Sequence, residues 1–329
     1  MEMRHLRYFV AVAEEEHITR AAERLGMQQP PLSQQIKAIE RELAVQLFRR
    51  KARGVELTDA GRAFHDNARE ILARLDHAFE TTRRTARGEQ GRISVGVTPT
   101  GPFHPFVPRV IRAYREVFPL VSVSLEESLS LQLIEHLRNE QIDAAFLRTP
   151  VADPEGLVIS PLLDESMVAA LPSSHVLAQS DGKRDAPISI KALVAETFIV
   201  YGRPSRPGQQ GLGQYEAMIA ACHAAGFSPR VGQDAPTIIS TLGLVAAGLG
   251  ISLVPASLQH MSMDGVVYRR LRGTIQPKAI LNLASRRGDP SAVVRNFLDL
   301  VKTEARVFHH NRRKESPVGQ RKGRARHVS

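Results

Sequence analysis

The sequence predicts a protein of three parts: a small helical domain at the amino terminus, one long helix, and a carboxy-terminal α/β domain of two lobes. Apolar residues recur at helical spacing in the first part, and a proline-free stretch with the same spacing runs from residue 59 to about 87. From residue 91 onward, short β-branched runs alternate with helical segments, a pattern typical of a mostly parallel sheet. The length of 329 residues suffices for two or three domains.

The first helix is expected near the amino terminus, where Leu6, Phe9, Val10 and Ala13 mark one apolar face that ends near Glu15.

The second and third helices follow at once. The second is expected to begin at Thr19, a good N-cap residue, and to end at Gly26, which permits a turn. The third has Pro30 and Pro31 in its first turn, where backbone amides lack intrahelical partners. At about 100° per residue, its apolar and polar residues fall on opposite faces. The inward residues are Leu32, Ile36, Ile39 and Leu43, and the outward ones include Gln34, Lys37 and Arg41.

Two helices joined by a tight turn, the second presenting amides, hydroxyls and cations from its start, suit a reader of the DNA major groove. Amides and hydroxyls hydrogen-bond base edges, and cations neutralise phosphates. The candidate DNA-binding residues here are Gln28, Gln29, Pro30, Pro31, Ser33, Gln34 and Lys37. A helical bundle with a solvated charged face is the alternative interpretation of the same periodicity.

The segment FRRKARGVELT, residues 48–58, predicts two short strands around a basic turn. Such a wing could set Arg49 and Arg50 against phosphates and direct Arg53 toward the adjacent minor groove. With the preceding helices it predicts a winged helix-turn-helix DNA-binding domain over residues 1–58.

Residues 59–88 are expected to form one linker helix about 42 Å long, more than so small a domain can cover. The apolar stripe of this helix consists of Phe64, Ile71, Leu75 and Phe79. A second copy of the helix is the simplest cover and predicts dimerisation through these residues. Cover by the rest of the same chain is the alternative.

The remaining part, residues 91–305, predicts two α/β lobes between which the chain crosses twice. The first lobe is expected over about 91–163 and 270–305, where a last helix covers residues 291–302, and the second over about 164–269. Strand carboxyl ends and helix N-termini would then face an interlobe cleft able to hold a small anion.

Most of the net charge of +10 lies at the carboxy terminus. Residues 306–329 hold eight Lys or Arg and one Glu, whereas residues 1–305 hold 36 and 33. The segment is poor in apolar residues, so a disordered basic tail with weak attraction to polyanions is expected. A solvated appendage and a functional arm both remain open.

A cytoplasmic protein is expected. The single cysteine, Cys222, excludes a disulfide framework and favours a reducing compartment. The opening segment has charges within its first apolar stretch and no cleavage signal. Residues 235–263 lack charged side chains, but prolines and glycines interrupt them, which favours a buried strand and helix over a membrane span.

The sequence contains no G-x-x-x-x-G-K-[ST] loop, no G-x-S-x-G elbow and no H-E-x-x-H motif. Its 12 histidines are scattered, and Cys222 lies in an alanine-rich helix where a packing role is expected. We therefore expect no catalytic residues, no metal site and no cofactor.

The first part resembles the amino-terminal domain of the LysR-type transcriptional regulators. The resemblance is carried by FVAVAEEEHITRAAERLGMQQPPLSQQIKAIERELAVQLFRR and then VELTDAGRAF. One departure is Ala44, where the family usually has glycine. Because alanine resists a left-handed helix cap, a slightly different approach to the wing is expected.

The carboxy-terminal part, residues 91–305, resembles the effector domain of the same family, which has the fold of periplasmic binding proteins. LSLQLIEHLRNEQIDAAFLR and TLGLVAAGLGISLVPASL carry this resemblance, and the latter is closest to the subgroup that governs degradation of aromatic compounds. The resemblance implies effector-binding residues at Thr98, Thr100, Ser130, Arg148 and Tyr201.

Hydroxyls on helix N-termini and one guanidinium suit a carboxylate, so the implied effector is an aromatic or muconate-like acid. The structural alternative is that Thr100 and Ser130 only cap helices and that Arg148 is a surface ion-pair partner.

The resemblance implies a regulator, not an enzyme, that binds an interrupted inverted repeat in double-stranded DNA. It would act as a dimer or tetramer, respond to the carboxylate, and have RNA polymerase as a further partner but no membrane. Two alternatives stay open: a ligand-binding or catalytic α/β protein whose helical domain serves assembly, and a repressor insensitive to ligand.

Overall fold

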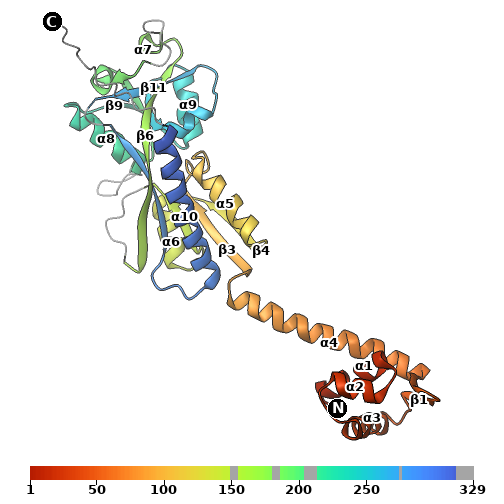
Figure 1. Ribbon diagram of the computed structural model, residues 1–329. Coiled ribbons are helices and arrows are strands. Elements are labelled where there is room, and N and C mark those ends of the chain that lie inside the picture. The colour runs from red at the N-terminus through yellow and green to blue at the C-terminus, as the bar shows by residue number, and fades with distance from the viewer. Residues whose placement is uncertain (149–154, 180–185, 204–212, 274–275, 316–329) are drawn as a thin grey trace, which may run out of the picture. The chain divides into compact units, whose positions relative to one another are not determined.

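The computed structural model describes residues 1–148, 155–179, 186–203, 213–273 and 276–315 (Figure 1). The chain divides into two compact units, Met1–Ala86 and Arg87–Ser329. The predicted long helix belongs to the first unit, and both α/β lobes belong to the second.

The first unit is a winged helix-turn-helix followed by a long helix, as predicted. Figure 1 shows its three short helices gathered at one end of the long one. The predicted inward residues Leu6, Phe9, Leu32, Ile36 and Ile39 are all buried and form its core. Its elements are α1 (Met3–Glu15), α2 (Ile18–Arg24), α3 (Gln29–Leu43), β1 (Phe48–Lys51), β2 (Gly54–Leu57) and α4 (Asp59–Ala86).

Three local predictions in this unit are wrong. The N-cap of α2 is His17, whose Nδ1 accepts a hydrogen bond from the Thr19 amide at 3.3 Å, so Thr19 lies inside the helix. Leu43 is 37 % exposed because α3 ends there. Ala44 adopts the left-handed conformation, with φ of 54°, so alanine does not prevent a left-handed cap at this position.

The second unit contains an eight-stranded sheet with the order β4-β3-β5-β12-β6-β11-β7, to which β10 is added by pairing with β6. β3 is parallel to both β4 and β5, as predicted, and β11 is parallel to β7. The expectation of a mostly parallel sheet is nevertheless wrong, because β12 runs antiparallel to β5 and β6, and β6 runs antiparallel to β10 and β11. The strands are β3 (Gln90–Val97), β4 (Leu120–Glu127), β5 (Ala144–Leu147), β6 (Leu157–Pro172), β7 (Ile188–Ser189), β10 (Ser252–Pro255), β11 (Val266–Arg272) and β12 (Lys278–Arg286).

Each lobe has helices on both faces of its strands. In the first lobe, α5 (Phe106–Val117) and α10 (Ala292–Glu315) share one core, and α6 (Ser130–Arg138) packs in the other. In the second lobe, the strand pair β8 and β9 adds to the sheet through a bridge between Phe198 and Ile251. The elements of this lobe also include α7 (Val176–Gln179), η2 (Ile190–Leu193), β8 (Thr197–Tyr201), α8 (Gly213–Ala224), β9 (Arg230–Ala235), α9 (Ile238–Ala246) and η3 (Ala256–His260).

The two lobes are joined by β6 and β12, and Figure 1 shows β6 running through both. Along β6, Leu163 packs in the core of the first lobe and Met167 in that of the second. Along β12, the change of core falls between Ala279 and Leu281. The second boundary predicted near residue 270 is therefore too early, because β11 still belongs to the second lobe.

The predicted tail also begins too early, because α10 continues to Glu315. Ala305 is buried, and the ring of Phe308 lies 5.5 Å from that of Phe106 and 5.8 Å from that of His104. These contacts extend the apolar face of the helix past residue 306. Residues 316–329 lie outside the described residues.

The uncharged window at 235–263 folds as the sequence predicts, with α9 and the strand β10 inside the second lobe. Within the described ranges, no helix combines the length and hydropathy needed to cross a bilayer. The same part of the chain contains no group of three His, Cys, Asp or Glu side chains placed to hold a metal ion.

Candidate functional site

The outward face of α3 carries the predicted DNA-binding residues. Because Leu32, Ile36 and Ile39 are buried on the other side, the polar residues are left toward solvent. Ser33 is half-buried, and the others are exposed: Gln28, Gln29, Pro30, Pro31, Gln34 and Lys37. Gln28 is the N-cap of α3, and the residues from Gln29 to Gln34 lie in its first two turns, next to the positive end of its dipole, whereas Lys37 lies past the middle of the helix.

Glu40 connects this helix to the wing, and sequence reasoning missed it. Its Oε1 accepts hydrogen bonds from the amides of Leu47 at 2.8 Å and Phe48 at 3.1 Å. The carboxylate therefore fixes the chain where it enters β1 instead of only offsetting nearby cations. Its spacing from the wing, seven and eight residues, fits no helical or turn rule that would have revealed the contact.

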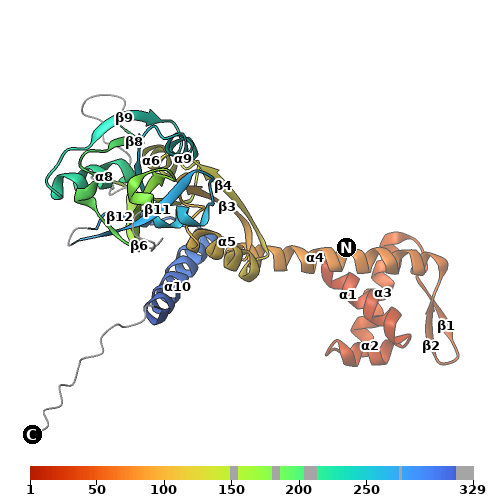
Figure 2. The same cartoon turned by 90° about the horizontal axis from the view of Figure 1, so that it is seen from above.

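The wing is an antiparallel hairpin of β1 and β2, which Figure 2 shows projecting beside the helices of the first unit. The predicted cations Arg49, Arg50 and Arg53 are all exposed. Arg49 forms an ion pair with Glu56, and so does Lys51. Arg50 and Arg53 have no ion pair within the described part of the chain.

The apolar stripe of α4 divides into two parts. The ring of Phe64 packs against that of Phe9 at 4.8 Å, so Phe64 belongs to the core of its own unit. Phe64 is only half-buried there, so its contribution to a dimer interface stays a prediction. Farther along, Ile71 is 42 % and Phe79 52 % exposed, and Leu75 between them is half-buried.

One cavity between the two lobes is lined by all five predicted effector-binding residues. Thr98 and Thr100 follow β3, and Arg148 follows β5, so they lie at the carboxyl ends of neighbouring strands. Ser130 is the first residue of α6, and Tyr201 ends β8 of the second lobe. The cavity has a volume of about 20 Å³, the space of a single water molecule.

Arg148 is occupied by a buried carboxylate that the sequence analysis did not foresee. Its Nη1 donates to the carbonyl of Ala279 at 3.0 Å, and its Nη2 lies 2.6 Å from Oε2 of Glu165. Arg148 is 6 % and Glu165 2 % exposed, so neither is a surface ion-pair partner. Oε1 of Glu165 accepts from the amide of Ser257 at 2.5 Å.

The Glu165 carboxyl remains ionised despite its burial. Burial alone would raise the pKa of Glu165, but the Arg148 charge, the hydrogen bonds from Ser257 and the nearby His104 outweigh it and lower that pKa. Ser257 lies in η3 of the second lobe, whereas Arg148 lies in the first lobe. The Glu165 carboxylate therefore contacts groups from both lobes. The only sequence signal was the pair of acidic residues, Asp164 and Glu165, inside the otherwise mostly apolar run LLDESMVAALP.

Other polar groups of the cavity are available to a ligand. Thr98 Oγ1 and Arg148 Nε are buried and accept or donate no hydrogen bond among the described residues. Ser130 Oγ accepts only weakly from the Arg148 amide, at 3.4 Å. Burial, with a smaller effect of the Glu127 carboxylate, raises the pKa of Tyr201 to about 12, so its hydroxyl stays protonated at neutral pH.

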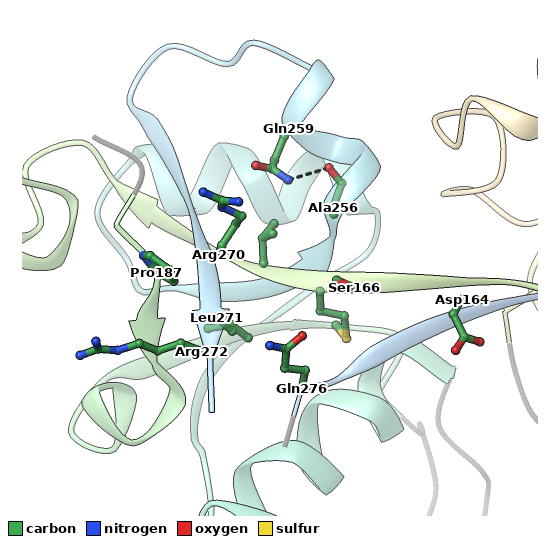
Figure 3. Close-up of a pocket in the computed structure, with 11 residues that line it drawn as sticks. Asp164, Ser166, Pro187, Ala256, Gln259, Arg270, Leu271, Arg272 and Gln276 are labelled. Atoms are coloured by element: carbon green, nitrogen blue, oxygen red, sulfur yellow. Dashed lines mark hydrogen bonds between the residues drawn. The ribbon is translucent and has the colours of Figure 1, made fainter. Parts of the chain in front are cut away.

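A second, larger hollow of about 800 Å³ lies where β11 ends in the second lobe (Figure 3). Arg270 and Arg272 line it from β11, and Asp164 lines it from β6, paired with Lys278 at 2.6 Å. No predicted site residue lies there. Its charged side chains are exposed, so solvent and salt screen their attraction for a ligand.

The chain matches two family models, "Bacterial regulatory helix-turn-helix protein, lysR family" over residues 3–62 and "LysR substrate binding domain" over residues 86–306. The transcriptional regulator AlsR of Bacillus subtilis (strain 168) is 36 % identical over 97 % of this chain and 100 % of AlsR. CatR of Pseudomonas putida is 35 % identical over 93 % of this chain and 100 % of CatR.

Solved structures agree with these matches. The crystal structure of CbnR, a LysR family transcriptional regulator, has a TM-score of 0.80 and 31 % identity, covering 92 % of this chain and 100 % of CbnR. Full-length CbnR complexed with its target DNA has a TM-score of 0.78 and 29 % identity over 93 % of this chain and 100 % of CbnR.

The fold and these matches define a DNA-binding transcriptional regulator with an effector-binding domain. The chain belongs to the LysR family. The relatives it matches are named as regulators and not as enzymes, in agreement with the expectation from the sequence.

Proposed function

We propose that this regulator reads DNA with the outward face of α3 and the wing, and that two copies bind an interrupted inverted repeat. The exposure of six of the seven α3 candidates, with the seventh half-buried among them, supports this assignment. Gln34 reads base edges, whereas Arg50 neutralises phosphates in any sequence, and Arg53, at the turn of the wing, approaches the backbone phosphates that border the adjacent minor groove.

Competition binding with a specific and a scrambled duplex tests these roles. Gln34→Ala should relax base preference by about 1–3 kcal/mol, the value of a lost bidentate contact, and Arg50→Ala should weaken both duplexes alike. Unchanged base preference for Gln34→Ala would remove that residue from base readout.

We further propose that the interlobe cavity holds a small carboxylate. The observation that supports it is the convergence of the five residues on one buried cavity. A cavity of about 20 Å³ is too small for an aromatic or muconate-like acid, so the lobes must separate to admit one. The acid accepts from the free Thr98 hydroxyl and the α6 amides, and Arg148 supplies the positive charge.

Thr98 offers the cleanest test, because its hydroxyl is buried and has no partner among the described residues. Thr98→Val should therefore leave the fold intact. It should also lose affinity for the acid, whereas Thr98→Ser keeps it. Calorimetric titration with benzoate and muconate measures both. If wild-type protein binds neither acid, the effector class is wrong, and if Thr98→Val binds as wild type does, the assigned contact is wrong.

A regulator that needs no ligand is the second candidate, because Glu165 already supplies Arg148 with a carboxylate. The two candidates differ in one observable: footprinting of the operator changes on addition of the acid only if the cavity is an effector site. Assembly to a tetramer and contact with RNA polymerase are further parts of the proposal.

A further inference from the structure

The wing carries four cations and a single carboxylate. Arg49, Arg50, Lys51 and Arg53 supply the positive charge, and Glu56 supplies the negative one. In the hairpin register Arg49 lies directly opposite Glu56. Since side chains alternate along a strand, Lys51 shares the face of Arg49. Strand pairing therefore sets one carboxylate between two cations.

Glu56 contacts both of these cations at once. Arg49 Nε pairs with its Oε1, and Lys51 Nζ pairs with its Oε2. The Glu56 side chain is 21 % exposed, against 65 % for Arg49 and 55 % for Lys51. The neighbouring Val55 is buried in the core of the unit, which fixes the strand that carries the carboxylate.

The other two cations of the wing, Arg50 and Arg53, form no ion pair with Glu56. Arg50 pairs across the hairpin with Val55, on the opposite face, and Arg53 lies in the turn. Both are exposed, and neither has an ion pair in the described ranges. They can contact a phosphate without first leaving a carboxylate.

We propose that Glu56 weakens the contact of the wing with DNA by holding Arg49 and Lys51. A phosphate must displace the carboxylate from these cations and is repelled by it. The wing then binds the DNA backbone mainly through Arg50 and Arg53. Contacts to the DNA backbone do not depend on the base sequence. If the wing contributes less to the free energy of DNA binding, the base contacts of α3 contribute a larger part of it, and binding is more specific. The inference rests on the proposed role of the wing in DNA binding.

Glu56→Gln in the full-length chain tests it, with a random-sequence 40-base-pair duplex as the probe. Affinity should rise about fivefold at low salt, the effect of releasing two exposed ion pairs. The slope of log affinity against log salt should steepen by about 1–2. Glu23→Gln, which removes an exposed carboxylate from α2, is the matched control and should leave the slope unchanged.

A double-mutant cycle isolates the contact. Arg49→Gln should change affinity less than about twofold in the wild-type chain, where Glu56 holds the arginine. In the Glu56→Gln background the same change should cost about threefold or more. Equal effects in the two backgrounds contradict the proposal. Thermal unfolding of Glu56→Gln and Glu56→Ala checks that the hairpin is retained.

Two failures are distinguishable. If Arg50→Gln and Arg53→Gln leave affinity and salt slope unchanged, the wing does not contact DNA, and the proposed function fails there together with this inference. If those variants weaken binding while Glu56→Gln binds no better than wild type, the wing contacts DNA but the inference alone is overturned. Glu56 would then orient the cations for phosphate.

Discussion

At the scale of single residues, the Glu165 carboxylate stabilises the fold as the partner of a buried charge. It is 2 % exposed and faces Arg148, which is 6 % exposed. Glu165→Gln leaves a buried guanidinium without its counter-charge, and we expect a loss of about 3 kcal/mol in the free energy of unfolding at pH 7. Urea unfolding measures it. A loss below about 1 kcal/mol would mean that the pair contributes little.

The same residue predicts a pH dependence. The pKa of Glu165 is lower in the folded chain than in the unfolded one, so its stabilisation is complete above the unfolded value of about 4.3. It is lost as the pH falls through the folded value. The stability difference between wild type and Glu165→Gln should therefore shrink in acid. A difference that stays constant from pH 7 to pH 3 would contradict this.

At Ala44, by contrast, we expect a substitution to increase the stability of the folded chain. An L-residue in the left-handed conformation destabilises the folded chain by about 1–2 kcal/mol. Glycine removes this strain, but it also makes the unfolded chain more flexible, which cancels part of the gain in stability. With φ of 54°, Ala44→Gly should raise the stability of the first unit by about 0.5–1 kcal/mol. Ala38→Gly, inside α3, is the control and should lower it by about 1 kcal/mol. Denaturant unfolding that ranks the two variants in the opposite order would refute the explanation.

At the scale of elements, α4 carries an apolar surface that the described chain leaves uncovered. Ile71 and Phe79 are exposed on the face where Phe64 is already packed. If a second α4 covers them, Phe79→Glu buries an unpaired charge and should dissociate the dimer. Ala73→Glu adds the same charge on the opposite face and should not. Sedimentation decides, and an unchanged mass for folded Phe79→Glu would exclude this interface.

The helices and the wing were predictable because their signals are local. Leu32, Ile36 and Ile39 repeat at helical spacing, and the strands flank a Gly-containing turn. The fate of the α4 stripe was not predictable, since periodicity shows that a face is apolar but not what covers it. Likewise, the charges around residue 306 obscured Ala305 and Phe308, which extend the buried face of α10.

At the scale of the whole molecule, resemblance to the family was enough to select five residues that line one cavity. It could not show that Arg148 is already engaged. Glu165 lies on a different strand, 17 residues from Arg148, and Ala279, which accepts from the same guanidinium, lies 131 residues away. Contacts of this kind depend on how β5, β6 and β12 pair, and that pairing has no signature in any one segment.

The pairing of β6 has a consequence for hydrogen exchange. This strand bonds to β12 from Leu157 to Ser166, and to β10 and β11 from Met167 to Pro172. Local unfolding of one half of β6 also destabilises the other half, because both belong to one continuous strand. The amides of the two lobes should therefore lose protection from exchange together. Phe146→Ala, in the first lobe, should therefore speed exchange at β8 in the second. Lobes joined by flexible loops would exchange independently; these two should behave as one cooperative body.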